Sequence, residues 1–317
     1  MNSVNPPIIA IVGQTASGKT SLALRLAKKF NGAVISADSQ QIYHQAKIGT
    51  NQPAGSWRRA NTKWQKATGK KRLYFVNTIP HFFIDTLSPN KQYSAAQFQA
   101  ETNKLCRKLS TAGVLPIIAG GTGLYVSAIV EGFKFPQGKP NLRLRKSLDK
   151  LSTATLQKKL KSLDYASWLV IDPSNRRRLI RALEHIITTG QSFSANQQKK
   201  LRSNTLIIGL NPNKNALRKS IIKRTAKMFG LGLVKEVKLL QKKYPHSPLL
   251  QSIGYREIID YLDGKISKAE SGQQIINHTW QYARRQMTWF KRMPNTNWVK
   301  KPTTAEKLVK QFIKNNI

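Results

Sequence analysis

The sequence predicts an α/β fold, in which a parallel sheet carries helices on both faces and a helical subdomain is inserted. Two observations support this prediction. Short apolar runs of strand length alternate with helix-forming segments, as in the βαβ units that build parallel sheets. Residues 131–203 are instead rich in Lys and Arg, favour helix and contain no strand-like run. The chain therefore divides into an α/β core, residues 1–130 and 204–317, and a helical insertion, residues 131–203.

The elements of the core follow in order along the chain. The expected strands are residues 8–12, 33–37, 114–119 and 206–210. An amphipathic helix is expected over residues 21–30, and basic helices are expected from residue 213 onward. Ligands of parallel α/β sheets bind at the carboxyl ends of the strands, so the residues that follow each strand are the first candidates for function.

The segment after the first strand carries a phosphate-binding motif. Its residues are Gly13, Gln14, Thr15, Ala16, Ser17, Gly18, Lys19 and Thr20. They match G-x-x-x-x-G-K-[ST] between a strand and a helix, which is the P-loop NTPase-like arrangement of nucleotide-binding and ATP-binding proteins. The loop's N–H groups cradle phosphate oxygens, Lys19 neutralises charge, and the Thr20 hydroxyl is placed to bind Mg²⁺. A chance match in a Gly- and Ser-rich turn is the alternative, and the strand–loop–helix context argues against it.

Acidic residues are scarce near this loop. The first hundred residues contain only Asp38 and Asp85. Asp38 follows the second strand and should face the phosphate site; a helix cap is the alternative. Asp85 is interpreted as a structural or metal-supporting residue, with a turn as the alternative. The strand over residues 114–119 ends in Gly-Gly rather than Asp, which weakens an ATPase interpretation.

Two further motifs are candidates for ligand contact. The run Gly120–Tyr125 places glycines and the Thr122 hydroxyl at a strand end, where backbone can approach a ligand closely. Arg178 and Arg181 lie three residues apart and so share one helix face, an arrangement that suits phosphate. A merely solvated charged face is the alternative for the arginines.

The charge of the chain points to a polyanionic partner. There are 54 Lys and Arg against 14 Asp and Glu, a formal charge of +40, and nucleic acid is the leading candidate. A generally basic proteome is the alternative. Residues 54–79 concentrate seven Lys and Arg with no acidic residue, and a strand is expected over residues 73–76 at the end of this segment. The segment either contacts RNA or forms a solvated loop.

The location follows from the same composition. The single cysteine, Cys106, excludes an internal disulfide framework and a Cys-based zinc site, and is interpreted as a buried apolar residue. No apolar run approaches the length of a membrane span. We therefore expect a cytoplasmic protein with no membrane association.

Taken together, these segments resemble the tRNA dimethylallyltransferases, also called tRNA isopentenyltransferases or IPP transferases. No one motif decides the resemblance, but their order and spacing match over nearly the whole chain. Besides the P-loop, the matching segments are Asp38–Tyr43, Ile48–Thr50, Pro80–Asp85, Tyr93–Phe98, Gly120–Tyr125, Asn175–Glu184, Ile253–Glu257 and Gln281–Phe290.

The resemblance implies an enzyme that transfers a dimethylallyl group from dimethylallyl diphosphate to N6 of the adenosine 3′-adjacent to the anticodon in tRNA. It implies Asp38 as general base, with Thr122 and Lys19 also catalytic. It assigns the leaving diphosphate to the P-loop, to Mg²⁺ on Thr20, and to Arg178 or Arg181. It also implies that the adenosine flips out of its stack, that the basic insertion grips the anticodon stem-loop, and that the protein acts as a monomer. The residues that it implies for tRNA contact are Asp38, Ser39, Gln40, Gln41, Thr122, Asn175, Arg176, Arg177, Arg178, Arg284 and Arg285.

The sequence departs from the family pattern at several positions. Gln14 replaces a usual proline, Lys47 a usual Asp, Gln52 a usual Lys and Trp280 a usual Arg. The eukaryotic members' zinc finger cannot form with one cysteine, so a short bacterial-type enzyme is the better comparison. Two functions of other classes stay open: a P-loop kinase for a small metabolite, and a non-catalytic RNA-binding protein descended from such an enzyme.

Overall fold

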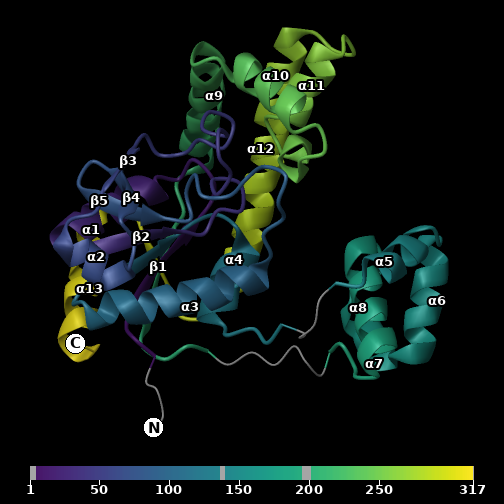
Figure 1. Ribbon diagram of the computed structural model, residues 1–317, viewed down its shortest axis with the longest axis horizontal. Coiled ribbons are helices and arrows are strands. Elements are labelled where there is room, and N and C mark those ends of the chain that lie inside the picture. The colour runs from purple at the N-terminus through teal and green to yellow at the C-terminus, as the bar shows by residue number, and fades with distance from the viewer. Residues whose placement is uncertain (1–4, 136–139, 195–200, 317) are drawn as a thin grey trace. The chain divides into compact units, whose positions relative to one another are not determined.

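The structure is a computed structural model that describes residues 5–135, 140–194 and 201–316. These residues fall in two compact units (Figure 1). The first lies within Met1–Val130 and Arg202–Ile317, and the second within Glu131–Leu201. Each unit is built around its own core.

The first unit contains an eight-stranded sheet in the order β3-β4-β5-β2-β6-β1-β7-β8. The strands are β1 (Ile8–Gly13), β2 (Gly32–Ser36), β3 (Ser56–Arg59), β4 (Arg72–Val76), β5 (Ile79–Phe82), β6 (Leu115–Ala119), β7 (Thr205–Leu210) and β8 (Thr296–Val299). Neighbours from β5 through β8 pair in parallel, whereas β3 and β4 pair antiparallel at one edge. The predicted α/β class with a mostly parallel sheet is confirmed. Strands β3, β5 and β8 were not predicted, because each is four residues long and lies at or near the edge of the sheet.

Helices cover the sheet and extend beyond it. They are α1 (Lys19–Lys29), α2 (Thr62–Thr68), α3 (Ala95–Thr111), α4 (Gly123–Val130), α9 (Lys214–Gly230), α10 (Leu233–Lys243), α11 (Arg256–Leu262), α12 (Lys268–Lys291) and α13 (Pro302–Asn316), with the 3₁₀ turn η2 (Pro248–Gln251). The central strands are apolar throughout and pack against α1 and α13 in one cluster that includes Leu26 and Val309. Buried strands of this kind are expected where helices cover a parallel sheet.

Helix α12 links two parts of the first unit. Its capping box, formed by Ser267 and Glu270, fixes where it begins. Its first half packs against α9 and α11, and further along it contacts β1 and α4. Figure 1 shows it as the long helix that runs from the α10–α11 group down to the sheet. Side chains from its second half therefore reach the carboxyl ends of the strands.

The basic segment over residues 54–79 is a folded part of the sheet. It forms β3, α2 and β4, and Asn61 caps α2 by accepting from the N–H of Trp64. The Trp64 side chain is buried, and Trp57 packs edge-on against Tyr74. The alternative of a solvated loop is therefore wrong for this segment, although its seven cationic side chains are all exposed. Its contact with RNA stays a prediction.

The second unit consists of α5 (Leu142–Asp149), α6 (Thr153–Leu163), α7 (Tyr165–Val170) and α8 (Arg176–Thr189). Leucine side chains of α6 and α8, among them Leu156, Leu160 and Leu183, form its core. The buried carboxylate of Glu184 binds Arg145 and Arg181. No strand occurs among the residues of this unit that the structure describes.

Candidate active site

The loop between β1 and α1 has the geometry that a phosphate site requires. Gly13 has φ of +145°, and a Cβ there would lie 2.6 Å from the carbonyl oxygen of Leu210, so only glycine fits. Gly18 caps α1 in the left-handed conformation with φ of +92°. The α1 N-terminus therefore opens directly onto the loop, where its free N–H groups favour an anion.

Two cations and one carboxylate meet beside this loop. Burial lowers the pKa of Lys19 to about 8; the Asp38 carboxylate opposes this shift and Arg224 adds to it. Burial raises the pKa of Asp38 above its usual value, against the effects of the Gln40 N–H and the Lys19 charge. The Arg224 guanidinium donates to the Thr15 hydroxyl at 2.7 Å, and its Nε is buried with no protein partner. One carboxylate does not neutralise two cations, so the site is complementary to a further anion.

Asp38 sits in a turn and not at a helix start. Its Oδ1 accepts from the Gln40 N–H at 2.9 Å, and residues 39–42 form turns, so the helix-cap alternative is wrong. Beside it, the Thr122 hydroxyl accepts from the Ser39 N–H at 3.0 Å. The loops after β2 and β6 are thereby joined, as expected for the ends of adjacent parallel strands.

Side chains of helix α12 hydrogen-bond to the P-loop and to the loop after β6. The Gln286 side chain accepts from the Thr15 N–H at 2.7 Å and donates to the Gly121 carbonyl at 2.8 Å. Tyr282 donates to the Gly121 carbonyl at 3.3 Å, and burial raises its pKa to about 12, so its hydroxyl stays protonated. Gln14 points away from the phosphate side of the loop and donates to the Ala283 carbonyl.

Two adjoining cavities open at this place. One, of about 260 Å³, is lined by the P-loop residues Thr15–Thr20 and by Gly120 and Gly121. The other, of about 310 Å³, has an apolar wall that includes Met228 and Ile275. Five residues line both cavities: Thr15, Asp38, Thr50, Asn51 and Arg224.

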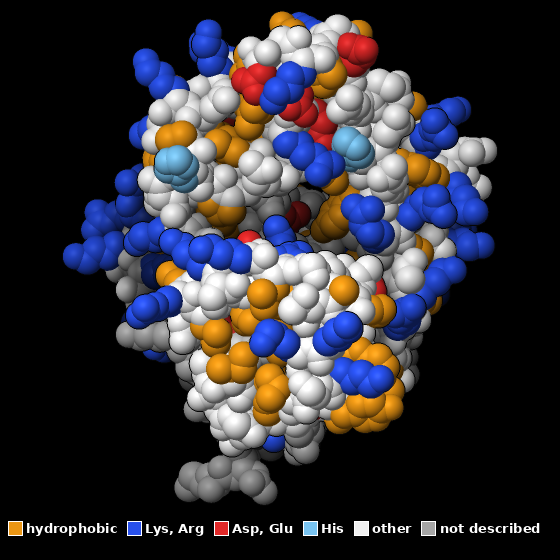
Figure 2. Space-filling view, turned by 90° about the vertical axis from the view of Figure 1, so that its right-hand side faces the viewer, with side chains coloured by type: hydrophobic (Ala, Val, Ile, Leu, Met, Phe, Trp, Pro, Cys, Tyr) orange, Lys and Arg blue, Asp and Glu red, His pale blue; other side chains and the backbone are white. Residues whose placement is uncertain are grey.

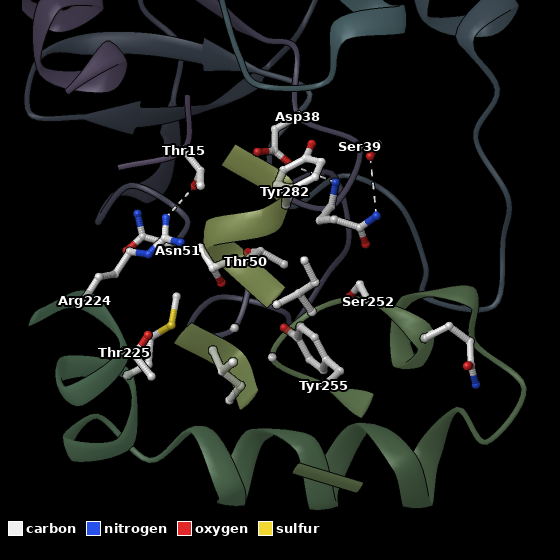
Figure 3. Close-up of a pocket in the computed structure, with 18 residues that line it drawn as sticks. Thr15, Asp38, Ser39, Thr50, Asn51, Arg224, Thr225, Ser252, Tyr255 and Tyr282 are labelled. Atoms are coloured by element: carbon white, nitrogen blue, oxygen red, sulfur yellow. Dashed lines mark hydrogen bonds between the residues drawn. The ribbon is translucent and has the colours of Figure 1, made fainter. Parts of the chain in front are cut away.

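Figure 3 displays the second cavity from the side. Asp38 and Tyr282 lie at one end of it, Tyr255 lies at the other, and Arg224 reaches toward Thr15. A polar, cationic chamber therefore opens into an apolar one at Asp38, and a ligand with a phosphate end and a hydrocarbon end matches that division.

The candidate protein ligand for Mg²⁺ is a single side chain, Thr20. The Thr20 hydroxyl lines the P-loop cavity, and the Ser17 hydroxyl there is buried without a partner. Within the described ranges, no group of three or more His, Cys, Asp or Glu could hold a metal ion. Mg²⁺ retains waters and takes substrate phosphates as ligands, so a single hydroxyl is compatible with it. Asp85 is engaged elsewhere, with the indole of Trp57 and with His44, which is a structural arrangement.

The predicted site residues lie in two places. The first unit brings together the P-loop, Asp38 to Gln41 and Thr122. Asn175 and the arginines at 176, 177, 178 and 181 belong to α8 and its cap in the second unit, where Arg176 binds Asp149. Arg181 binds the buried Glu184, which gives it a role inside its own unit.

A third cavity in the first unit lies along α12. It has a volume of about 1020 Å³, and its lining includes Trp280, Arg284, Lys214 and Lys300. Arg285 is exposed on the same helix. Lys and Arg side chains are scattered over the face displayed in Figure 2, where acidic side chains are fewer. The surface is thus suited to a polyanion beyond the immediate site.

Sequence reasoning missed three residues of the site. Arg224 lies at helical spacing from the buried Leu217, Ile221 and Met228 of α9, and an Arg at that spacing is a signal that could have indicated it. Tyr282 and Gln286 fall inside a quoted motif, and their spacing of four places them on one helix face. Gln52, which replaces a usual Lys, donates to the carbonyls of Gln41 and Tyr43.

Comparison with known proteins shows the family to which the chain is similar. Residues 41–293 match the family model described as IPP transferase. The chain is 38% identical over 320 residues to the tRNA dimethylallyltransferase of Halothermothrix orenii, covering 98% of this chain and 92% of that protein. It is 34% identical over 318 residues to the one from Staphylococcus haemolyticus, covering 96% of this chain and 90% of that protein.

Two solved structures are similar in fold. The full-length tRNA isopentenylpyrophosphate transferase from Bacillus halodurans superposes with a TM-score of 0.70 at 31% identity, covering 98% of each chain. A eukaryotic dimethylallyltransferase acting on tRNA superposes with a TM-score of 0.80 at 24% identity, covering 98% of this chain and 80% of that one. The second likeness concerns the fold alone. No helix among the residues that the structure describes is long and apolar enough to cross a membrane.

Proposed function

The chain belongs to the IPP transferase family, and from that premise we propose that it transfers a dimethylallyl group from dimethylallyl diphosphate to tRNA. The acceptor is N6 of the adenosine 3′-adjacent to the anticodon, and diphosphate is released. The observation that carries this proposal is the pair of adjoining cavities that meet at Asp38, one cationic and one with an apolar wall.

Asp38 acts as the general base. Adenine N6 is a weak nucleophile because its lone pair is delocalised into the ring, so removing its proton helps the reaction. The N6 nitrogen forms a bond to C1 of the dimethylallyl group, the C1–oxygen bond breaks, and its electron pair leaves with the diphosphate. The N6 proton passes to Asp38, whose raised pKa makes it a stronger base than an exposed Asp. The Thr122 hydroxyl accepts from the N–H of Ser39, the residue after Asp38, and it helps to orient the acceptor adenosine.

The leaving diphosphate is held by cations already in place. Lys19, Arg224 and the N–H groups of the P-loop neutralise the charge that grows on it, and such preorganised stabilisation lowers the barrier without rearrangement. Arg178 or Arg181 of α8 adds to these cations, as the resemblance implied. Thr20 would hold Mg²⁺, which when bound supplies further positive charge to the diphosphate.

The tRNA provides a flipped adenosine. An adenosine within the loop must leave its stack to reach Asp38. Ser39 and Gln40, which line the cavity with the apolar wall, and the neighbouring Gln41 then recognise its edge. Gln40 Oε1 is buried and has no protein partner, so it can accept from the base. The basic α8 of the second unit and Arg284 and Arg285 of α12 contact the RNA backbone, which is how structured RNA is usually gripped.

The test of this function supplies dimethylallyl diphosphate and ATP in separate reactions. Purified protein is incubated with unmodified tRNA and dimethylallyl diphosphate, and in parallel with ATP and small metabolite acceptors. We expect dimethylallyl-adenosine in tRNA digests and released diphosphate in the first reaction alone. Phosphoryl transfer from ATP without prenylated adenosine would instead identify a kinase, and RNA binding without either product would identify a binding protein.

A further inference from the structure

The segment 46–51 borders the site from outside the strand ends. Thr50 and Asn51 line both cavities, and their carbonyl oxygens accept from the Gln41 side-chain amide at 3.4 and 3.2 Å. The other end of that amide accepts from the Ser36 hydroxyl at 3.0 Å. The orientation of Gln41 therefore depends on where the segment 46–51 lies.

One carboxylate holds this segment by its backbone. Glu236 of α10 accepts from the N–H groups of Lys47, Ile48 and Gly49, at 2.9, 2.8 and 2.9 Å. Hydrogen bonds to an ionised acceptor are roughly twice as strong as neutral ones. The Lys47 side chain is exposed and takes no part, which explains why a Lys is accepted at this position.

Tyr255 completes the attachment. Its hydroxyl donates to Glu236 at 2.8 Å, and its side chain is fully buried. A Cβ on Gly49 would lie 2.5 Å from the Tyr255 ring, so the segment packs directly against the hydroxyl end of the ring. Gly254, before it, is fixed with φ of +94° by a hydrogen bond from its N–H to Glu257. The backbone next to Tyr255 is thus fixed as well, which holds the Tyr255 ring in position against the segment 46–51.

We propose that Glu236 and Tyr255 are positioning residues that fix the segment 46–51, and through it Gln41, for recognition of the acceptor base. The proposal rests on the proposed function. The P-loop is anchored separately, by Gln286. Loss of Glu236 therefore acts first on Gln41 and the acceptor side, and it leaves the P-loop's own contacts with the diphosphate in place.

Steady-state kinetics with each substrate varied separately test this division. For Glu236→Ala we expect kcat/KM for tRNA to fall about 10- to 100-fold, since misplacement by about 1 Å has effects of that order. The KM for dimethylallyl diphosphate should change by less than about twofold. Glu236→Gln retains one acceptor oxygen and should recover part of the loss, and Tyr255→Phe should cost about threefold.

A matched control uses another glutamate of the same unit. Glu270 also accepts a backbone N–H, from Ser267 at the start of α12, but does not contact the segment 46–51. Glu270→Ala should lower the melting temperature without separating the two KM values. If Glu236→Ala raises both KM values equally, or neither, the proposal is overturned.

Hydrogen exchange keeps this test independent of activity. In Glu236→Ala the amides of Lys47, Ile48 and Gly49 should exchange about tenfold faster or more, while those of β1 stay protected. Unchanged exchange would overturn the proposal even if activity fell. If the wild-type chain transfers no dimethylallyl group but its amides respond in this way, the proposed function fails while the attachment of the segment stands.

Discussion

The two walls of the active site differ in how they are built. One wall consists of loops at the carboxyl ends of β1, β2 and β6; it supplies Lys19 and Asp38, and Thr122 supports it through its bond to Ser39. The other consists of helices α9 and α12, and supplies Arg224, Tyr282 and Gln286. The strand-end wall is local in sequence, because each of these residues lies within six residues of the end of a strand. The helical wall exists only because residues far apart in sequence fold over the loops. Function depends on both walls, so substitutions in either wall test this comparison.

The largest effect is expected on the strand-end wall, at Asp38. Asp38→Asn keeps the shape but cannot accept the N6 proton, so kcat should fall about 10³-fold or more, within the usual range of general-base catalysis. Affinity for tRNA, measured by filter binding, should change little. Asp85→Asn is the matched control: it alters a carboxylate bound to Trp57 and His44, and should keep most of the activity. Full activity in Asp38→Asn would show that the base is wrongly assigned.

The next effect tests whether the helical wall shares in the chemistry. Arg224→Ala should lower kcat/KM for dimethylallyl diphosphate about 100-fold, a loss typical for one preorganised group that stabilises developing charge. Arg224→Lys should recover only part, since it lacks the bond to Thr15. The control is Arg218→Ala, an exposed cation of the same helix. Equal behaviour of the two variants would mean that α9 is scaffold alone.

Two residues of the strand-end wall should set the pH dependence of the reaction: Asp38 at acid pH and Lys19 at alkaline pH. Below the raised pKa of Asp38 the base is protonated, so kcat/KM falls as the pH decreases. In the enzyme without bound substrate, Lys19 loses its proton above pH about 8. The value of kcat/KM for dimethylallyl diphosphate therefore falls again, by about tenfold per pH unit. In the profile of kcat the alkaline limb should move to higher pH, because bound diphosphate favours charged Lys19. An alkaline limb at the same pH in both profiles would argue against contact between Lys19 and diphosphate.

The smallest effect concerns the contact between the two walls. Gln286→Leu removes the bonds to the Thr15 N–H and the Gly121 carbonyl but keeps an apolar helix face. We expect kcat/KM to fall about tenfold for both substrates, because the P-loop and the Thr122 loop lose their common support. Gln281→Leu, exposed on the same helix, is the control. A loss confined to one substrate would show that the two loops are held independently.

The same contrast explains what the sequence could predict. Gly13–Thr20 carries its own signature, since glycines at fixed spacing are required by the backbone itself. Asp38 and Thr122 could be found because the end of a parallel strand has a known place in the fold. Arg224 could not be assigned, because its role comes from packing that brings α9 beside the P-loop, 209 residues away from Thr15. The strand β3 was obscured for another reason: its exposed side chains include Arg58 and Arg59, and its partly buried side chain, Trp57, packs against Tyr74 of β4.

The central claim is that the hydrocarbon moves while the phosphates stay in the loop. Nucleoside mass spectrometry tests it most directly, on tRNA from a host that lacks its own dimethylallyltransferase, with and without this chain. The account predicts one added five-carbon group on the adenosine 3′-adjacent to the anticodon, present with the wild-type chain and absent with Asp38→Asn. Unmodified adenosine at that position with the wild-type chain, in a host that makes dimethylallyl diphosphate, would contradict it.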